Sequence, residues 1–269
     1  GFIGSNLFKY LKERNYQVEG FDIKEISQTN FEDFIPNPNN FDIVVHLGAI
    51  SSTVERDINK ILRYNLDFTK KLLDKCNKAG TSFIYASSAS VYGNIQMEKN
   101  ISRIKETDPV FPTSPYSWSK FLFDDFINKS DNFDIAIQGL RLFNVYGKGE
   151  EGKGDQQSVF GKFKNQGIKN KEIKVFEKSE QIKRDFIWVG DVCKVIEKMF
   201  DIGNKNIWNL GTGVANSFMN IAKIYSDKLD AKITEIKMPN NLKGQYQYFT
   251  CSNNDKLNKL IGEYKFKTI

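Results

Sequence analysis

Hydrophobic and polar residues alternate with two different periods along the first 150 residues. Short runs rich in β-branched and aromatic residues predict strands at 17–23, 42–47, 82–87 and 134–140. Between these runs, apolar residues spaced three and four apart predict helices at 5–13, 59–79 and 116–129. Strands that alternate with helices form a parallel sheet covered on both faces. The predicted fold class is therefore α/β, with a doubly wound parallel sheet.

The pattern changes after about residue 150, where it becomes irregular and richer in Gly and Lys. We expect residues 1–150 to form the main domain, with 185–215 returning to it. Residues 151–184 and 216–269 are expected to form a smaller substrate-binding lobe. Within the returning segment, 185–192 is predicted to join the main sheet, and Asp191 is predicted to cap a helix at 191–201.

Composition argues against several classes of protein. The 269 residues are 40% hydrophobic, as in a globular chain, and no apolar run approaches the ~20 residues that span a bilayer. Three Cys without metal-ligand spacing predict reduced thiols in a cytoplasmic protein, and the single histidine, His46, argues against a metal site or a His-based triad. The net charge of +6 comes from Lys scattered among Asp and Glu, so we expect neither nucleic acid nor membrane as a partner.

The two ends suggest that the chain is a piece of a longer protein. It begins Gly-Phe-Ile-Gly, without an initiator Met and without a strand before the glycines. We expect the first strand of the sheet to be missing, and residues 1–269 alone to fold poorly for that reason.

The first residues have the pattern of a phosphate-binding turn. Gly1 and Gly4 precede a predicted helix, and small residues there let a pyrophosphate approach the backbone and the helix N-terminus. Asp22 follows at a spacing that suits a carboxylate on the adenosine ribose, although Lys24 could instead contact a 2′-phosphate. After the second strand, a small-residue turn would let the same cofactor cross the sheet edge; it contains Leu47, Gly48, Ala49, Ile50 and Ser51.

Tyr116 and Lys120 carry most of the functional prediction. Four residues apart on a predicted helix, they share one face. A nearby ammonium favours phenolate, so we expect Lys120 to lower the pKa of Tyr116 and prepare it to exchange a proton with a sugar alcohol. Ser88, at the end of the third strand, is expected to hydrogen-bond the same alcohol.

Two further residues are candidate substrate ligands. Asn144 follows the fourth strand and could position a phosphate or sugar, and Arg184 offers a guanidinium to a diphosphate. The alternative for Arg184 is ordinary surface charge.

Taken together, these motifs resemble the extended short-chain dehydrogenase/reductase superfamily, which has a Rossmann-type fold. The resemblance rests on motifs that run in the family's order along nearly the whole chain: Gly1-Phe2-Ile3-Gly4, Ala86-Ser87-Ser88, Tyr116-x-x-x-Lys120, Arg141-x-Phe143-Asn144-Val145-Tyr146-Gly147 and Asn209-Leu210-Gly211-Thr212-Gly213.

Within that superfamily the chain resembles the ADP-L-glycero-D-manno-heptose 6-epimerases. The stretches Tyr116–Asp124, Gly152–Gly154, Lys183–Phe186 and Leu242–Gln247 carry this likeness. It implies NADP as the cofactor, with NAD possible, ADP-heptose as the substrate, and a homo-oligomer. It also implies Lys153 as a second acid/base group that touches the cofactor. The remaining cofactor residues it implies are Phe2, Ile3, Ile23, Asn65 and Val145. The substrate residues it implies, besides Asn144 and Arg184, are Phe176, Glu177, Lys178, Ser179 and Tyr246.

The chain departs from this family at three positions. Asp155 and Lys162 stand in the substrate region where the family has Ser and His, and a carboxylate near a diphosphate should weaken binding unless Lys162 compensates. Ile23 replaces a polar residue after Asp22, which leaves NAD against NADP open.

The expected reaction is epimerisation at C-6 through transient oxidation and re-reduction, with Tyr116 and Lys153 on opposite faces of the sugar. Two alternatives stay open: another nucleotide-sugar epimerase, such as a UDP-hexose 4-epimerase that needs one base, and a non-catalytic NAD(P)-binding regulatory protein. A dehydratase is disfavoured because Ser87-Ser88-Ala89 lacks a Thr-Asp/Glu pair.

Overall fold

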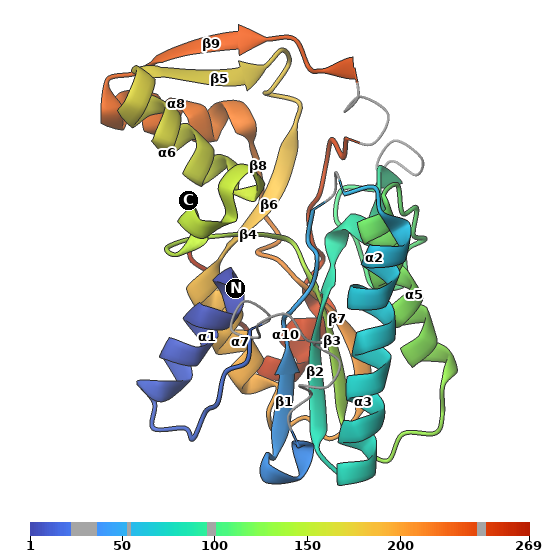
Figure 1. The fold of residues 1–269 in the computed structure, drawn as a ribbon. Helices are drawn as coiled ribbons and strands as arrows, with labels where there is room; N and C mark the ends of the chain where they lie inside the picture. Colours follow the sequence, from blue (N-terminus) through green and yellow to red (C-terminus); the bar gives the residue numbers. More distant parts are fainter. Residues whose placement is uncertain (23–36, 53–54, 96–100, 241–245) are drawn as a thin grey trace. The chain divides into compact units, whose positions relative to one another are not determined.

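The computed structural model describes residues 1–22, 37–52, 55–95, 101–240 and 246–269 (Figure 1). The chain divides into two compact units, each assembled from three segments. Unit 1 contains residues 1–91, 112–141 and 193–208, and unit 2 contains residues 92–111, 142–192 and 209–269.

Unit 1 is built on a four-stranded sheet in the order β1-β2-β3-β7. β1 and β2 are parallel, with Ile43 opposite Ser82. The elements in chain order are α1 (Phe2–Lys12), η3 (Pro38–Asn40), β1 (Ile43–His46), α2 (Ile58–Leu62), η4 (Arg63–Asp67), α3 (Phe68–Ala79), β2 (Ser82–Ser88), η5 (Ala89–Tyr92), α5 (Pro115–Lys129), β3 (Ile137–Leu142), α7 (Val189–Lys198) and β7 (Lys205–Leu210). The predicted α/β class with a doubly wound parallel sheet is confirmed.

The apolar core of unit 1 packs α3 and α5 against β2 and β3. Its buried members are Leu72, Leu73, Cys76, Phe83, Tyr85, Phe123, Ile127 and Ile137. Helix α5 begins at a capping box, in which Ser114 and Ser117 each bond the other's backbone, and Pro115 occupies its first turn. The core fixes which face of α5 meets the sheet, and the cap fixes where the helix begins.

Two predictions within unit 1 are wrong in detail. Residues 17–22 form no strand, because their side chains are mostly exposed and no described strand pairs with them. The helix predicted at 59–79 is interrupted by the π-helical turn η4, which turns the buried Asn65 toward the loop after β1. Single π turns of this kind often occur at functional sites.

Unit 2 contains a three-stranded sheet, β4-β6-β8, and a two-stranded sheet, β5-β9. β6 is parallel to β4 and antiparallel to β8, and β5 is parallel to β9. The elements are β4 (Asn144–Tyr146), η6 (Glu150–Gln156), α6 (Val159–Asn170), β5 (Glu172–Phe176), β6 (Lys183–Trp188), β8 (Ala215–Ser217), α8 (Phe218–Leu229), β9 (Lys232–Ile236) and α10 (Asp255–Ile261).

Residues 185–192 do not join the main sheet, contrary to the prediction. Phe186 belongs to the apolar cluster that α6, α8 and β5 share, and β6 pairs with β4 and β8 instead. Asp191 does not cap the helix either. It lies inside the first turn of α7 and accepts hydrogen bonds from the Tyr264 hydroxyl at 2.8 Å and the Lys267 N–H at 2.7 Å.

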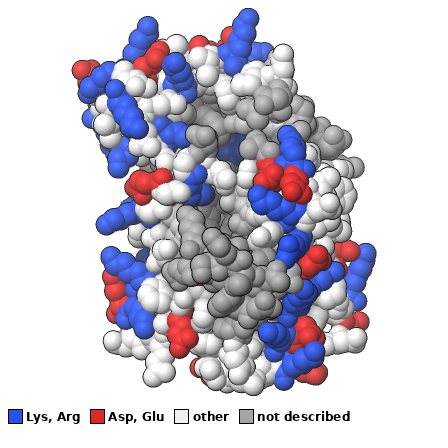
Figure 2. Space-filling view, viewed as in Figure 1, with Lys and Arg blue, Asp and Glu red and all other residues white. Residues whose placement is uncertain are grey.

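The charged side chains on the face shown in Figure 2 lie interspersed, Lys and Arg among Asp and Glu. Within the described ranges, the structure contains no helix with the length and apolar character needed to cross a membrane.

Candidate active site

The start of α1 presents open backbone beside a carboxylate. Gly1 precedes the helix without a side-chain cap, and a Cβ at Gly1 or Gly4 would meet no other atom within 4 Å. Phe2 and Ile3 lie in the first turn of the helix, and the Gly1 amino group contacts Asp22. Free backbone N–H groups at a helix start suit a phosphate, and a carboxylate beside them suits ribose hydroxyls. These residues therefore fit a dinucleotide. Ile23, also predicted here, lies outside the described residues.

The turn after β1 is held by Asn65. The Asn65 side chain accepts the Ile50 N–H at 2.8 Å, donates to the Ile50 carbonyl at 3.0 Å, and donates to Ser119 Oγ at 3.1 Å. Its amide is thus engaged by the turn and by α5, and its direct role is to fix the loop. Gly48 and Ala49 in that loop are exposed, while Leu47 and Ile50 are half-buried.

His46 has the packing of a structural residue. Its Nε2 lies 3.0 Å from Thr69 Oγ1, and burial lowers its pKa to about 3, so the ring is neutral at physiological pH.

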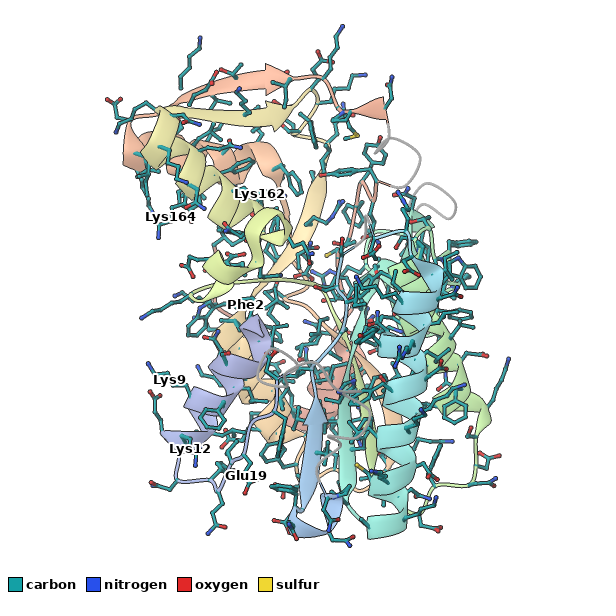
Figure 3. The ribbon with its side chains drawn as sticks, in the orientation of Figure 1. Phe2, Lys9, Lys12, Glu19, Lys162 and Lys164 are labelled. Atoms are coloured by element: carbon teal, nitrogen blue, oxygen red, sulfur yellow. The ribbon has the colours of Figure 1, made fainter. Side chains whose placement is uncertain are left out.

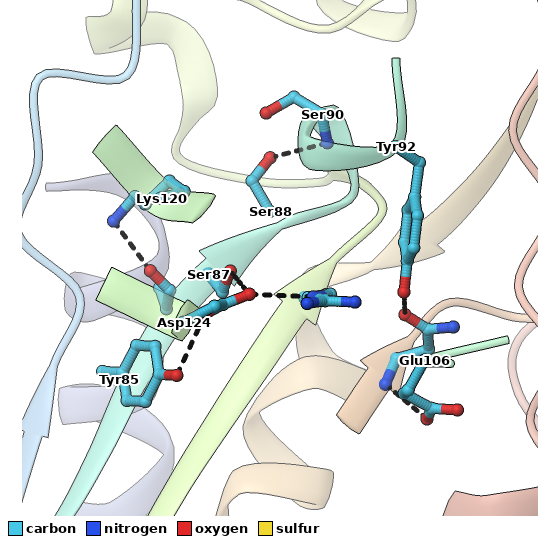
Figure 4. Close-up of polar contacts among 11 residues, drawn as sticks. Tyr85, Ser87, Ser88, Ser90, Tyr92, Glu106, Lys120 and Asp124 are labelled. Atoms are coloured by element: carbon cyan, nitrogen blue, oxygen red, sulfur yellow. Dashed lines mark hydrogen bonds and ion pairs between the residues drawn. The ribbon is translucent and has the colours of Figure 1, made fainter. Parts of the chain in front are cut away.

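Ser88 at the end of β2 and Lys120 on α5 lie near each other (Figure 4), and Tyr116 stands one helical turn before Lys120 on the same helix. Ser88 Oγ accepts the Ser90 N–H at 3.2 Å. The Ser88 hydroxyl also lies near enough to Tyr116 to lower the pKa of its phenol. Lys120 is 6% exposed, and its Nζ donates to the Ala86 carbonyl at 2.7 Å. The structure thus brings three of the four predicted catalytic residues together in unit 1.

The expected effect of Lys120 on Tyr116 is wrong. Burial raises the pKa of Tyr116, and only the Ser88 hydrogen bond opposes it. The Lys120 ammonium is directed at the Ala86 carbonyl, and burial lowers its own pKa to about 8. The cost of burying a phenolate therefore exceeds any benefit from the cation one helical turn away.

Four residues to which the motifs gave no functional role lie directly behind this site. The Asp124 carboxylate accepts from Tyr85 Oη at 2.9 Å, Ser87 Oγ at 2.9 Å and Arg141 Nε at 2.8 Å (Figure 4). Asp124 is 1% exposed and Arg141 5%. Gly139 leaves room for this arrangement, since a Cβ there would lie 2.4 Å from the Tyr85 hydroxyl. Of these four residues, Asp124 could have been found from the sequence, because it follows Lys120 by one helical turn and so lies on the same face of the helix.

Lys153 lies in unit 2, on the short helical segment η6. Burial lowers the pKa of Lys153, Glu150 raises it, and Lys162 lowers it further. Glu150 is 4% exposed and accepts the Ser158 N–H at 2.7 Å and its hydroxyl at 2.9 Å, which ties η6 to the start of α6. Lys162 projects from α6 and is exposed (Figure 3). The Asp155 side chain lies outside the described part of the chain.

A buried guanidinium stands among aromatic rings elsewhere in unit 2. Arg184 is 5% exposed, lies 5.6 Å from the Phe218 ring centroid and 5.5 Å from that of Tyr246, and donates to the Lys183 carbonyl at 3.1 Å. Burial lowers its pKa to about 10, so it remains a cation. No ion pair to it forms among the described residues, and a phosphate group would supply the missing charge.

The other predicted substrate residues gather partly around this cation. The Phe176 and Tyr246 rings are 5.9 Å apart, at the end of β5. Ser179 follows in a turn with Glu177 and Lys178, and within the described residues its buried hydroxyl has no hydrogen-bond partner. Asn144 and Val145 lie on β4, where Asn144 Oδ1 accepts from Thr250 Oγ1 at 3.4 Å. No direct contact joins Asn144 or Val145 to Arg184 in the described residues.

We predict that Arg184→Met weakens binding of a nucleotide diphosphate sugar. Charge-assisted hydrogen bonds to a buried cation contribute about 1.5–3 kcal/mol, so the dissociation constant should rise about 10- to 100-fold. Titration calorimetry with ADP-heptose measures this. Lys183→Met, at the exposed neighbouring position, is the matched control and should bind as the wild type does. Equal affinity of the Arg184 variant and the wild type would contradict the assignment.

A doubly wound sheet with a phosphate-binding turn and a Ser-Tyr-Lys cluster at its edge defines the class of NAD(P)-binding enzymes. The chain belongs to the NAD dependent epimerase/dehydratase family, which residues 1–211 match.

Its relatives include heptose epimerases. An ADP-L-glycero-D-manno-heptose-6-epimerase of Brachyspira hyodysenteriae is 34% identical over 96% of this chain and 88% of that protein. The crystal structure of the Helicobacter pylori ADP-L-glycero-D-manno-heptose-6-epimerase is similar with a TM-score of 0.82 and 27% identity, over 100% of this chain and 89% of that one. UDP-glucose 4-epimerase of Thermotoga maritima shares the fold, with a TM-score of 0.82 and 22% identity, over 100% and 92% of the two chains.

Proposed function

We propose that this protein interconverts ADP-D-glycero- and ADP-L-glycero-D-manno-heptose at C-6. The observation that carries the proposal is the 34% identity, over 96% of the chain, to a heptose-6-epimerase. The Ser88 hydroxyl beside Tyr116, with the buried Lys120 on the same helix, supports the chemistry independently of that relative.

The chain's residues would hold the cofactor and move the protons. A bound nicotinamide would accept a hydride from the sugar and return it to the other face. The N–H groups at Phe2–Gly4 suit its diphosphate, Asp22 its adenosine ribose, and Lys120 the ribose nearer the reaction. We propose NADP rather than NAD on the family resemblance, and comparing the dissociation constants of the two tests that choice. Assembly as a homo-oligomer is proposed on the same ground, and a cytoplasmic location is proposed from the three cysteines without metal-ligand spacing.

When only the carbonyl group turns over and the rest of the sugar stays bound, its oxygen meets a different protein group before and after the turn, so this form of the reaction uses two acid/base groups. Ser88 Oγ accepts the Ser90 N–H, so its own proton is free to be donated to the Tyr116 oxygen. Burial keeps Tyr116 protonated near neutral pH, and Tyr116 therefore rests as the acid. Burial favours the neutral amine of Lys153, which suits Lys153 to accept a proton.

Incubation of the protein with NADP and one ADP-heptose epimer tests the proposal. Proton NMR of the sugar should reveal both epimers at equilibrium. Absence of conversion, together with interconversion of UDP-glucose and UDP-galactose, would replace this proposal with the UDP-hexose 4-epimerase alternative.

A further inference from the structure

We propose that Asp124 is a positioning residue for Tyr116 and Lys120. Asp124 lies on α5, and its carboxylate is hydrogen-bonded to side chains of β2 and β3. These bonds fix how α5 is turned against the sheet, and so fix the positions of Tyr116 and Lys120 on the same helix face. The role of Tyr116 and Lys120 rests on the proposed function, whereas the contacts of Asp124 do not.

Four consecutive residues of β2 contact three residues of α5 that are spaced one helical turn apart. Tyr85 and Ser87 donate hydrogen bonds to Asp124, and the Ala86 carbonyl accepts one from Lys120. The Ser88 hydroxyl stands beside Tyr116 and lowers the pKa of its phenol. Because a helix repeats every ~3.6 residues, positions 116, 120 and 124 form one line along α5. A rotation or slide of the helix would break all of these contacts together, so they determine where the Tyr116 hydroxyl lies.

Asp124 is the most strongly held member of this line. Its two carboxylate oxygens accept three hydrogen bonds from two strands, and one of these is a charge-assisted bond from Arg141. Lys120 by comparison makes one hydrogen bond within the described residues, to the Ala86 carbonyl. The bonds of Asp124 therefore hold α5 in place at position 124. Because the helix is rigid, the position of Tyr116, two turns away, is determined with it.

Asp124 also supports the positive charge of Lys120. Burial lowers the Lys120 pKa, and the Asp124 carboxylate is the group that raises it. The other titratable groups on these elements are Tyr116 on α5, Tyr85 on β2 and Arg141 on β3, the last two bonded to Asp124, and His46 on β1, whose pKa the Lys120 charge helps to lower. His46 is neutral at physiological pH, Tyr85 is held protonated because burial raises its pKa, and Arg141 is not among the causes of the Lys120 shift. Asp124 is therefore the group whose removal should change the charge of Lys120.

The Asp124→Asn variant tests whether Asp124 positions Tyr116 and Lys120 or only stabilises the fold. In the folded variant we expect the Lys120 pKa, followed by NMR of carbon-13-labelled lysine, to fall by about one unit. The alkaline limb of the kcat profile should move down by the same amount, because the cation is now lost at a lower pH. At the optimum kcat should fall about 10- to 100-fold, with the KM for ADP-heptose little changed. Asp125→Asn, next on the same helix and ion-paired with the exposed Lys129, is the matched control and should leave the pKa and both limbs unchanged.

Asp124→Asn removes the carboxylate charge that lies 2.8 Å from the buried Arg141 Nε, and the variant could fail to fold. The double variant Asp124→Asn with Arg141→Met removes both charges of this ion pair, and it should fold and lower the Lys120 pKa in the same direction. The inference is overturned if either folded variant retains the wild-type Lys120 pKa. If the wild type is active, the variant must also retain the wild-type pH profile of kcat. Asp124 would then have only a structural role. The NMR titration requires no turnover. A shifted Lys120 pKa with no epimerase activity in the wild type would therefore refute the proposed function and leave the role of Asp124 intact.

Discussion

Tyr116→Phe is expected to reduce kcat for heptose epimerisation by about 10²- to 10⁴-fold, the range for loss of a general acid/base group. Burial keeps the Tyr116 phenol protonated, so the substitution removes the group that would donate a proton to the sugar oxygen. It removes one hydroxyl and one hydrogen bond, and the free energy of unfolding should fall by only about 1 kcal/mol. Steady-state kinetics and urea unfolding on the same preparation measure both quantities.

Tyr16→Phe is the matched control, since Tyr16 is 41% exposed in the same unit and carries none of the proposed chemistry. Its kcat should stay within twofold of the wild type. A Tyr116 variant that also stays within twofold would remove Tyr116 from the mechanism, and with it the reading of the Ser88 hydrogen bond as catalytic.

Lys153→Met is expected to abolish epimerisation to a similar extent, by about 10²- to 10⁴-fold in kcat, because proton transfer on the second face loses its group. Methionine keeps most of the side-chain volume, so η6 should retain its attachment through Glu150 and Ser158. The dissociation constant for ADP-heptose should change much less than kcat. Comparing calorimetric binding with the NMR rate separates loss of chemistry from loss of affinity.

Lys164→Met removes the same charge from an exposed position on α6 and should turn over normally (Figure 3). This pair of variants also distinguishes the reaction classes. A one-base 4-epimerase would tolerate Lys153→Met, so full activity of that variant would reject the two-base mechanism and favour the alternative.

The sequence was sufficient to predict those parts of the site that are formed by residues near one another along the chain. The helix that carries Tyr116 and Lys120, the strand that ends at Ser88 and the glycines at the start of α1 all depend on residues that lie close along the chain. Their order also carried the family resemblance, which the 34% identical relative and the family match confirm. The ordering of motifs is a property of the sequence and needs no knowledge of packing.

The parts that were wrong or missed depend on long-range contacts. The strand partner of residues 183–188 was decided by the cluster that receives Phe186, and the π turn at Asn65 by hydrogen bonds to Ile50 and Ser119. Sequence spacing put Asp124 on the face of Lys120, but Tyr85, Ser87 and Arg141 reach it only because β2 and β3 pack behind α5.

The pKa of Tyr116 illustrates the division most directly. The sequence by itself determined that a cation stands one helical turn from the phenol, since helix geometry is local. Only the tertiary structure decided that packing desolvates the half-buried phenol and that the ammonium is turned to the Ala86 carbonyl. Desolvation depends on every atom packed around a group, wherever it lies in the chain, and for that reason it reversed the shift that the spacing alone predicted.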